Sequence, residues 1–223
     1  MTVKLFFQAI AKFIAGLVLV GLLLFLPAGT FGYRNAWLFI AILFVPMFIV
    51  GIVMMFRDPD LLKKRLSAKE EEKEQKAVVA LSGLMFLAAF IVAGLNFRFS
   101  WIVMPDWTAY IGAGIFLLAY VMYAEVLREN AYLSRTVEVQ EDQKVIDTGL
   151  YGVVRHPMYS ATLFLFLSMG VVLGSPISVA ILLLYIPIIA LRMKNEEKVL
   201  EEGLEGYAAY RKKVKYKVIP FIW

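Results

Sequence analysis

The sequence of 223 residues contains no cysteine and a single histidine, His156. Without cysteine the chain has no disulfide bond, no cysteine-ligated zinc or iron–sulfur cluster and no thiol nucleophile. One histidine argues against a metal site built from histidines, so we expect no metal at the functional site. Neither Gly-x-Gly-x-x-Gly nor Gly-Lys-Ser/Thr occurs in the chain, which argues against a Rossmann or P-loop nucleotide site.

Charged residues are scarce, at 18% of the chain, whereas 61% of the residues are hydrophobic and the mean hydropathy is +0.74. Soluble domains are only about 45–50% apolar, so the composition predicts an integral membrane protein. Four uncharged runs are long enough to cross about 30 Å of hydrocarbon: residues 13–33, 35–56, 77–97 and 107–124. The first run is long for a signal peptide and shows no evident cleavage site, so we expect it to be retained.

A fifth uncharged run covers residues 158–191 and is too long for one span, because 34 residues of helix measure about 51 Å. A Gly-Ser-Pro sequence at 174–176 interrupts this run. We therefore predict a C-terminal hairpin of two short helices. The polar residues 192–217 that follow have the apolar spacing of an amphipathic helix.

Lysine and arginine are distributed unevenly between the two sides of this predicted bundle. With six crossings and a cytoplasmic N-terminus, 21 of the 23 Lys and Arg residues lie in the cytoplasm, and only Arg34 and Arg98 lie outside. This asymmetry follows the positive-inside rule. We predict a cell (inner) membrane protein with both termini in the cytoplasm. The net charge of +5 reflects that orientation, and no nucleic-acid partner is expected.

A polar loop meets the last uncharged run at residues 149–160, where Arg155 stands next to His156. The simple interpretation is a helix start at the membrane surface, with Pro157 in the first turn and His156 as its cap. The functional interpretation makes His156 a hydrogen-bond partner or an acid–base group, and Arg155 an anchor for an anion. Local pattern alone does not choose between the two interpretations.

Arg192 and Glu196 are four residues apart, and Glu197 follows them, where the last apolar run ends. A surface ion pair at this spacing contributes only about 0.2–0.5 kcal/mol. Ionisable groups that face the bundle at the end of a membrane helix are, however, often functional. Two carboxylates at this position can neutralise a cationic ligand.

The sequences Asp-Thr-Gly-Leu-Tyr at 147–151 and Arg-His-Pro-Met-Tyr at 155–159 resemble the signature of the isoprenylcysteine carboxyl methyltransferase family and its bacterial and archaeal relatives. Arg192 and the Glu196–Glu197 pair continue the match in the family's order. The match then includes Leu200, Tyr207, Tyr210, Val214, Pro220 and Phe221. It covers roughly residues 130–223. Ser160-Ala161 departs from the small residue followed by glycine that relatives often have, which bears on the shape of the acceptor tunnel.

The resemblance implies an integral membrane, S-adenosylmethionine-dependent methyltransferase whose cofactor pocket is unlike the soluble Rossmann type. The cofactor-binding residues that it implies are Gln143, Lys144, Val145, Ile146, Tyr151, Arg155, His156, Pro157, Met158, Tyr159 and Glu196. Thr136 occupies a further family position that contacts the cofactor. Arg192 and Glu197 are the implied catalytic residues. Arg192 would orient a carboxylate acceptor, whereas an amine acceptor would need a base, for which His156 and Glu197 are candidates.

The implied acceptor is a lipophilic small molecule or a prenylated substrate that enters from the membrane lipid. The acceptor atom (O, N or S) and the oligomeric state stay open. Two other functions also stay open. One is a membrane reductase that uses NADPH on lipid or sterol substrates, because some sterol reductases have a similar C-terminal fold and a related His-Pro motif. The other is a non-enzymatic scaffold or transporter, although the first three spans carry no charge at mid-span.

The predicted fold is therefore an all-α integral membrane protein with about five to six transmembrane helices. These include the C-terminal helical hairpin, and a cytoplasmic cofactor-binding loop and a C-terminal amphipathic helix complete the fold. No linker divides residues 1–223, so we expect a single membrane domain. Residues 1–127 would hold four N-terminal helices and residues 128–223 the methyltransferase-like catalytic region. Within the polar loop, residues 144–146 have some strand-like character.

Overall fold

A computed structural model describes residues 3–57, 73–130 and 139–223, together with Pro59, Leu62, Leu66 and Tyr132. Helices are the regular secondary structure in this part of the chain, and no strand occurs among the described residues. The strand-like residues 144–146 lie in an irregular connection instead. Thr136 lies outside the described residues.

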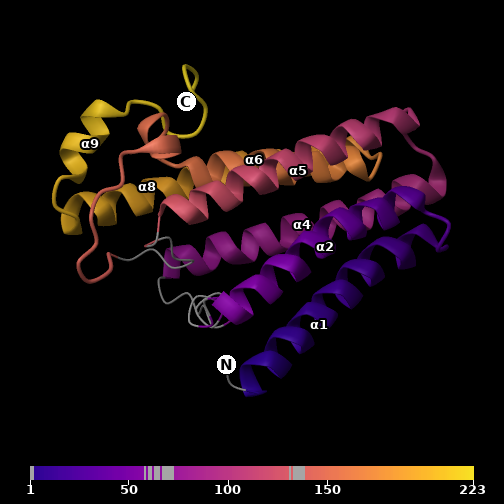
Figure 1. The fold of residues 1–223 in the computed structure, drawn as a ribbon. Coiled ribbons are helices and arrows are strands. Elements are labelled where there is room, and N and C mark those ends of the chain that lie inside the picture. The colour runs from indigo at the N-terminus through magenta and orange to yellow at the C-terminus, as the bar shows by residue number, and fades with distance from the viewer. Residues whose placement is uncertain are drawn as a thin grey trace.

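Nine helical segments have defined bounds in the described part of the chain (Figure 1). The N-terminal part consists of α1 (Val3–Ala28), α2 (Arg34–Arg57), α4 (Lys73–Phe99) and α5 (Asp106–Glu129). The C-terminal part consists of η1 (Gly149–Gly152), α6 (Pro157–Val172), α7 (Pro176–Leu182), α8 (Tyr185–Gly203) and α9 (Tyr207–Lys213). Five segments are long and apolar enough to cross a membrane, and α6 is a shorter apolar helix. The predicted all-α membrane fold is confirmed.

The predicted hairpin break lies between α6 and α7. Gly174 has a φ of +68°, which ends α6 in a conformation that L side chains rarely adopt. Ser175 then caps α7, because its side-chain oxygen accepts the N–H of Ser178 at 3.2 Å. Pro176 occupies the first turn, where its missing N–H costs nothing.

The sequence suggested one polar helix over residues 192–217, but the structure divides this stretch: residues 192–203 continue α8, and residues 207–213 form the separate helix α9. Helix α8 begins among apolar residues at Tyr185 and continues through Arg192 to Gly203. Residues 176–203 together form an apolar-to-polar segment of 28 residues, about 42 Å long at 1.5 Å per residue. One element therefore carries both a membrane-spanning stretch and the polar turns of the candidate site.

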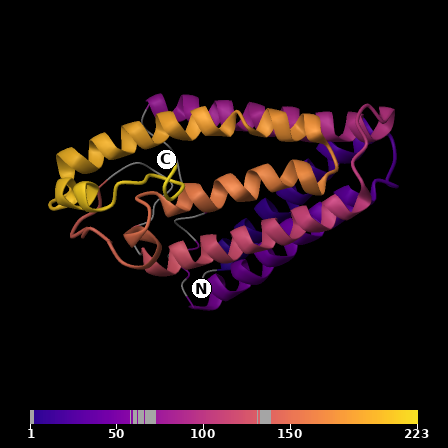
Figure 2. The same cartoon turned by 90° about the horizontal axis from the view of Figure 1, so that it is seen from above.

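Close helix packing depends on glycine at two interfaces. A Cβ on Gly112 of α5 would lie 2.8 Å from the backbone nitrogen of Val172 in α6. A Cβ on Gly94 of α4 would lie 2.6 Å from the carbonyl oxygen of Leu24 in α1. Small residues at such crossings let membrane helices approach closely. Seen from above, α6 lies between α5 on one side and α4 with α8 on the other (Figure 2).

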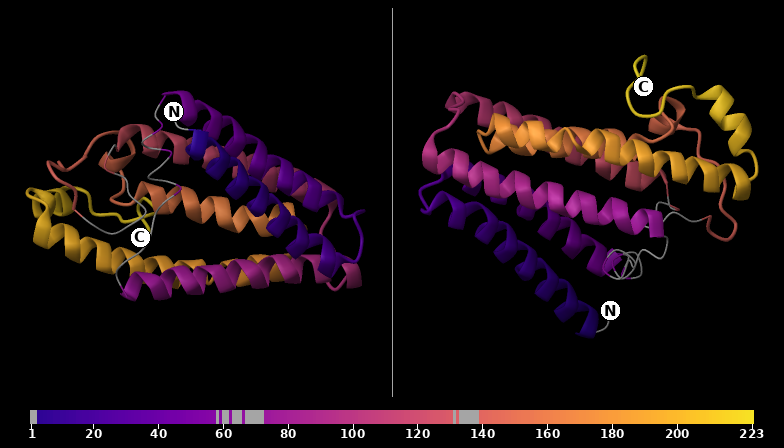
Figure 3. Two further views of the ribbon diagram at one scale, coloured as in Figure 1. Left: turned by 90° about the horizontal axis from the view of Figure 1, so that it is seen from below. Right: turned by 180° about the vertical axis from the view of Figure 1, so that it is seen from behind.

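The outer surface of the bundle is apolar, as expected for a face in contact with lipid. Leu26, Leu118 and Val121 are each about two-thirds exposed or more, although they lie in long helices. The described ends of the chain lie toward one end of the bundle. The turns α1–α2, α4–α5 and α6–α7 gather at the opposite end, as further views confirm (Figures 1 and 3).

Candidate active site

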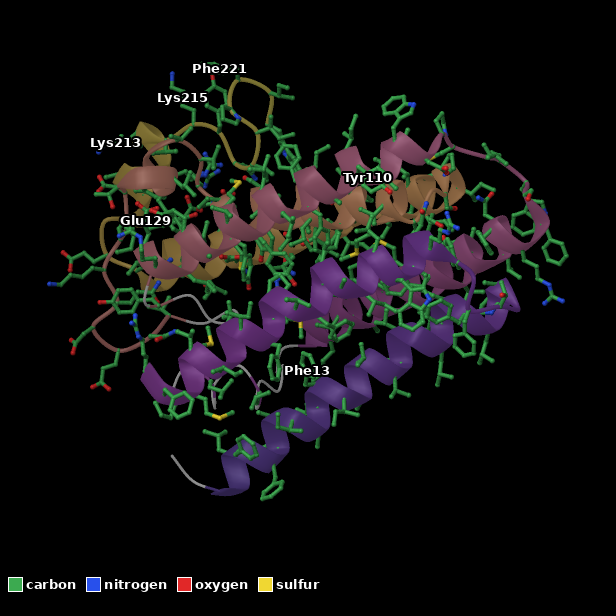
Figure 4. All side chains as sticks on the ribbon, turned by 45° about the vertical axis from the view of Figure 1, so that its right-hand side comes forward. Phe13, Tyr110, Glu129, Lys213, Lys215 and Phe221 are labelled. Atoms are coloured by element: carbon green, nitrogen blue, oxygen red, sulfur yellow. The ribbon has the colours of Figure 1, made fainter. Side chains whose placement is uncertain are left out.

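The loop that enters the site is fixed to the end of α5. The backbone N–H of Leu150 donates to a carboxylate oxygen of Glu129 at 3.0 Å. Gly149 has a φ of +47°, and a Cβ there would overlap the Glu129 carboxylate at 1.5 Å, so only glycine fits this contact. Figure 4 shows Glu129 at the end of the bundle that also carries Lys213 of α9.

The start of α6 is only partly explained by its helix-forming sequence. Pro157 occupies the first turn as predicted, and His156 stands at the cap position, but its side chain makes no capping bond. The backbone N–H groups of Arg155 and His156 instead donate to the carbonyl oxygens of Tyr216 and Lys217 at 2.9 and 2.8 Å. The C-terminal segment therefore holds the start of α6 from outside, and the histidine ring is free for another contact.

A buried ion cluster surrounds Glu197. Arg155 donates from Nε to Glu197 Oε1 at 2.8 Å, and its guanidinium also reaches the carbonyl oxygens at positions 214 and 215. Lys217 Nζ lies 3.0 Å from Glu197 Oε2. His156 Nε2 lies 3.2 Å from Glu197 Oε1. An ionised carboxylate only accepts hydrogen bonds, so we assign the Nε2 proton to His156.

A hydroxyl group connects the two predicted site residues on α8. The Tyr159 hydroxyl accepts from Arg192 Nε at 2.9 Å and donates to Glu196 Oε2 at 2.7 Å. Glu196 Oε1 also lies 3.8 Å from His156 Nδ1. Tyr159 is buried and the Glu196 side chain is only 25% exposed. Arg192 and Glu196 thus belong to a partly buried network, unlike a simple surface ion pair.

One cleft collects nearly all of the site residues predicted from the sequence. The cofactor-binding candidates that line it are Gln143, Lys144, Val145, Ile146, Tyr151, Arg155, His156, Pro157, Met158, Tyr159 and Glu196. Of the two predicted catalytic residues, Arg192 lines the cleft. Glu197 is instead buried in the ion cluster, beside the lining residues Arg155 and His156. Three segments distant in the sequence therefore meet at one place.

Sequence reasoning missed the remaining walls of the cleft. The additional lining residues are Asn130, Tyr132, Val199, Leu200, Leu204, Tyr207 and Tyr210. Leu200, Tyr207 and Tyr210 were matched family positions without an assigned role. Val199 and Leu200 follow Glu196 by three and four residues, so the helical repeat of α8 was a signal for their shared face.

Tyr207 has a buried hydroxyl that finds no hydrogen-bond partner within the described part of the chain. Its neighbour Tyr210 differs, because that hydroxyl donates to the carbonyl oxygen of Tyr151 at 2.8 Å. Burial raises the pKa of all three tyrosines, to about 12 for Tyr151. The three phenols are therefore neutral at physiological pH. An unpaired buried polar atom is costly, and its position in the cleft wall points to a ligand as its partner.

Comparison with known proteins connects this site to a family. Residues 107–205 match the family model described as phospholipid methyltransferase. This stretch is less than half of the chain, but it includes every predicted site residue. Among curated proteins, no sequence matches this chain.

The fold is similar to that of a solved eukaryotic intramembrane Ras methyltransferase, isoprenylcysteine carboxyl methyltransferase. The TM-score is 0.56 at 19% sequence identity, and the match covers 96% of this chain and 77% of that chain. At this identity the likeness concerns the fold. The family match of residues 107–205 and this membrane fold together support the class of integral membrane methyltransferases.

Together with the family match, this likeness confirms the resemblance to the isoprenylcysteine carboxyl methyltransferase family that the sequence predicted. Neither comparison supports the alternative of an NADPH-dependent reductase.

Proposed function

We propose that this protein transfers a methyl group from S-adenosylmethionine to a lipophilic acceptor at the cytoplasmic face of the cell membrane. The observation that carries the proposal is the meeting of three distant segments at one cleft: residues 143–146, residues 155–159 and the polar end of α8. The methyltransferase class of the fold and of residues 107–205 supports the type of reaction.

The residues present fit the cationic and nucleoside parts of S-adenosylmethionine. Glu196, with one oxygen bonded to Tyr159 and a partly exposed side chain, supplies negative charge for a sulfonium. Tyr151, Tyr207 and Tyr210 supply aromatic surface, and the unpaired Tyr207 hydroxyl supplies a hydrogen bond. The enclosed volume is about 100 Å³, below the ~300–1,000 Å³ usual for ligand sites. A ligand of this size would therefore extend into the mouth of the cleft.

When bound, S-adenosylmethionine supplies an already activated methyl group, so the protein's contribution is to bind and orient the reactants. Good orientation alone is worth up to about 7–11 kcal/mol of a reaction barrier. Tyr159 holds Arg192 and Glu196 in one arrangement through its two hydrogen bonds. Arg192 would then present a planar donor to a carboxylate acceptor, while Glu196 keeps its charge near the methyl donor.

The acceptor would reach the site from the bilayer. The site lies at one end of a bundle whose outer surface is apolar, so a lipophilic molecule or a prenylated chain can approach within the membrane. The charge distribution of 21 cations against two supports a cytoplasmic location for this end. S-adenosylmethionine, which is water-soluble, would then enter from the cytoplasm.

The test uses the purified full chain with radiolabelled S-adenosylmethionine and a total membrane lipid extract. We expect label to appear in an extractable lipophilic product, and calorimetry to detect binding of S-adenosylmethionine but not of NADPH. Tyr159→Phe should reduce transfer strongly. Tyr185→Phe is the matched control, because it removes a buried α8 hydroxyl whose partner is Thr162, outside the cleft lining. Absence of S-adenosylmethionine binding by the folded wild-type protein would refute the proposal.

A further inference from the structure

A second cavity lies at the end of the bundle opposite the candidate active site. The turns α1–α2, α4–α5 and α6–α7 meet there (Figures 1 and 3), and the cavity between them has a volume of about 540 Å³. Helix α5 begins at this cavity with Asp106 and ends at Glu129, and the next residue, Asn130, lines the cleft. Its 24 residues separate the two sites by about 36 Å, so the second cavity is a site distinct from the cleft.

Two opposite charges line this cavity without neutralising one another. Arg34 is the first residue of α2 and Asp106 is the first residue of α5. Within residues 3–57, 73–130 and 139–223, neither side chain has an ion pair or a hydrogen bond. Asp106 is well placed for its helix dipole, whereas a cation at the N-terminus of α2 is unfavourable. Arg34 also opposes the positive-inside rule, so neither helix stability nor orientation accounts for it.

The walls of the cavity are preformed. Asn96 is buried and holds Ile102 through both of its backbone groups, at 3.0 and 3.1 Å. This contact fixes the α4–α5 turn that forms one rim. On the opposite wall, the Asn35 amide nitrogen lies so close to Gly174 that a Cβ there would approach it to 2.8 Å. The Asn35 amide has no hydrogen-bond partner in the described part of the chain, and it therefore adds a free polar group to the cavity.

Aromatic side chains mark the depth of the cavity in the membrane. Exposed aromatic residues gather on the segments around it: Phe31, Trp37, Phe99, Trp101, Trp107 and Tyr110. Such belts lie at the level of the lipid headgroups. A phospholipid headgroup is therefore the ligand that reaches this position at high local concentration. Val103 and Tyr110, which are 77% and 70% exposed beside the cavity, offer apolar surface to its acyl chains.

We propose that this cavity binds the headgroup of a zwitterionic phospholipid, with the phosphate at Arg34 and a primary ammonium at Asp106. A guanidinium matches the geometry of a phosphate, and a primary ammonium donates hydrogen bonds to a carboxylate. A trimethylammonium group cannot donate such bonds. The cavity should therefore prefer phosphatidylethanolamine over phosphatidylcholine, and also over phosphatidylglycerol, which has no cation for Asp106.

Native mass spectrometry of the purified full chain tests the proposal with each of these three lipids added in turn. Phosphatidylethanolamine should be retained about tenfold better than either other lipid. Arg34→Gln should lower its retention about tenfold, and Asp106→Asn should abolish the preference over phosphatidylglycerol. Arg98→Gln is the matched control, because Arg98 is the other cation predicted on this side and does not line the cavity. It should leave retention unchanged.

Three results would overturn the proposal. Equal retention of the three lipids by the wild-type protein would mean nonspecific surface lipid. An equal effect of Arg34→Gln and Arg98→Gln would mean general electrostatics. Displacement by soluble glycerophosphoethanolamine at the same concentration as the lipid would mean that a free zwitterion, and not a membrane lipid, is the ligand. S-adenosylmethionine affinity should be unchanged in Arg34→Gln, which also verifies that the variant is folded.

Discussion

Removal of a single oxygen atom from Tyr207 should stabilise the protein without ligand and weaken cofactor binding. The Tyr207 hydroxyl is buried in the cleft wall and unpaired within the described residues. An unsatisfied buried hydroxyl costs about 1–3 kcal/mol. Tyr207→Phe removes that cost from the ligand-free state, so we expect its free energy of unfolding to rise by about this amount.

Tyr207→Phe should weaken the binding of S-adenosylmethionine by the same free energy by which it stabilises the ligand-free protein. Wild-type protein gains a partner for the hydroxyl when the cofactor binds, whereas the phenylalanine variant gains nothing. The dissociation constant of S-adenosylmethionine should therefore rise about 5- to 150-fold, which is 1–3 kcal/mol at about 1.4 kcal/mol per tenfold change. The two measurements should agree in magnitude, because both report the hydroxyl's missing partner.

Tyr210→Phe is the matched control for this experiment. Its hydroxyl is also buried at the cleft but already donates to the Tyr151 carbonyl oxygen at 2.8 Å. Its removal should lower the stability of the ligand-free protein by about 0.5–1.5 kcal/mol. Denaturation followed by fluorescence, together with calorimetric titration, measures both quantities. A loss of stability in Tyr207→Phe, or an unchanged affinity despite higher stability, would refute the assignment of this hydroxyl to the cofactor.

Three further predictions concern the acceptor side, the topology and the pH dependence. Glu196→Gln should weaken binding of S-adenosylmethionine by about 1.5–3 kcal/mol. Arg192→Ala should leave the dissociation constant of S-adenosylmethionine nearly unchanged but lower turnover with a carboxylate acceptor. If both variants changed affinity and turnover alike, the assignment of Glu196 to the cofactor and Arg192 to the acceptor would be contradicted. Since the chain has no cysteine, single cysteines can report the topology. Lys212→Cys should react with an impermeant thiol reagent only in opened cells, whereas Thr30→Cys should react in intact cells. The reverse labelling pattern would show that the predicted topology is inverted. The pKa of Tyr151 is raised from 10.0 to about 12 by burial, so its contribution to stability is present below pH 10 and is lost as the pH rises to 12. The free energy of unfolding of Tyr151→Phe should therefore fall less over this interval than that of the wild-type protein. Parallel plots of unfolding free energy against pH for the two proteins would disprove the shift.

The sequence predicted those features that depend on local composition. Four uncharged runs correspond to α1, α2, α4 and α5, because hydropathy decides which segments cross a membrane. The Gly-Ser-Pro break at 174–176 separates α6 from α7 as expected. The cofactor-side residues at 143–146 and 155–159 line one cleft, and this placement agrees with the family's motif order. The division into an N-terminal and a catalytic region at residue 127 stays a prediction.

Features that depend on partners distant in the sequence could not be predicted. The backbone of Arg155 and His156 pairs with residues 216 and 217, about 60 positions away, and no periodic pattern encodes that pairing. The hydroxyl of Tyr159 lies between Arg192 and Glu196 only because α6 and α8 pack side by side. The sequence showed a charged pair at helical spacing, but the side chain between them comes from another helix.

Glu197 is the clearest example of a residue whose role depends on its surroundings. Both of its carboxylate oxygens are occupied, Oε1 by Arg155 and His156 and Oε2 by Lys217. A carboxylate held by two cations has little tendency to take a proton from an amine acceptor. We therefore infer that Glu197 acts by positioning, since it keeps the proton of His156 on Nε2 and leaves the lone pair on Nδ1. Nδ1 lies on the side of Glu196 and the cleft, at 3.8 Å from Glu196 Oε1. Of the two bases that the sequence left open for an amine acceptor, His156 is thus the one with a ring nitrogen that lies outside the Glu197 ion cluster and toward Glu196.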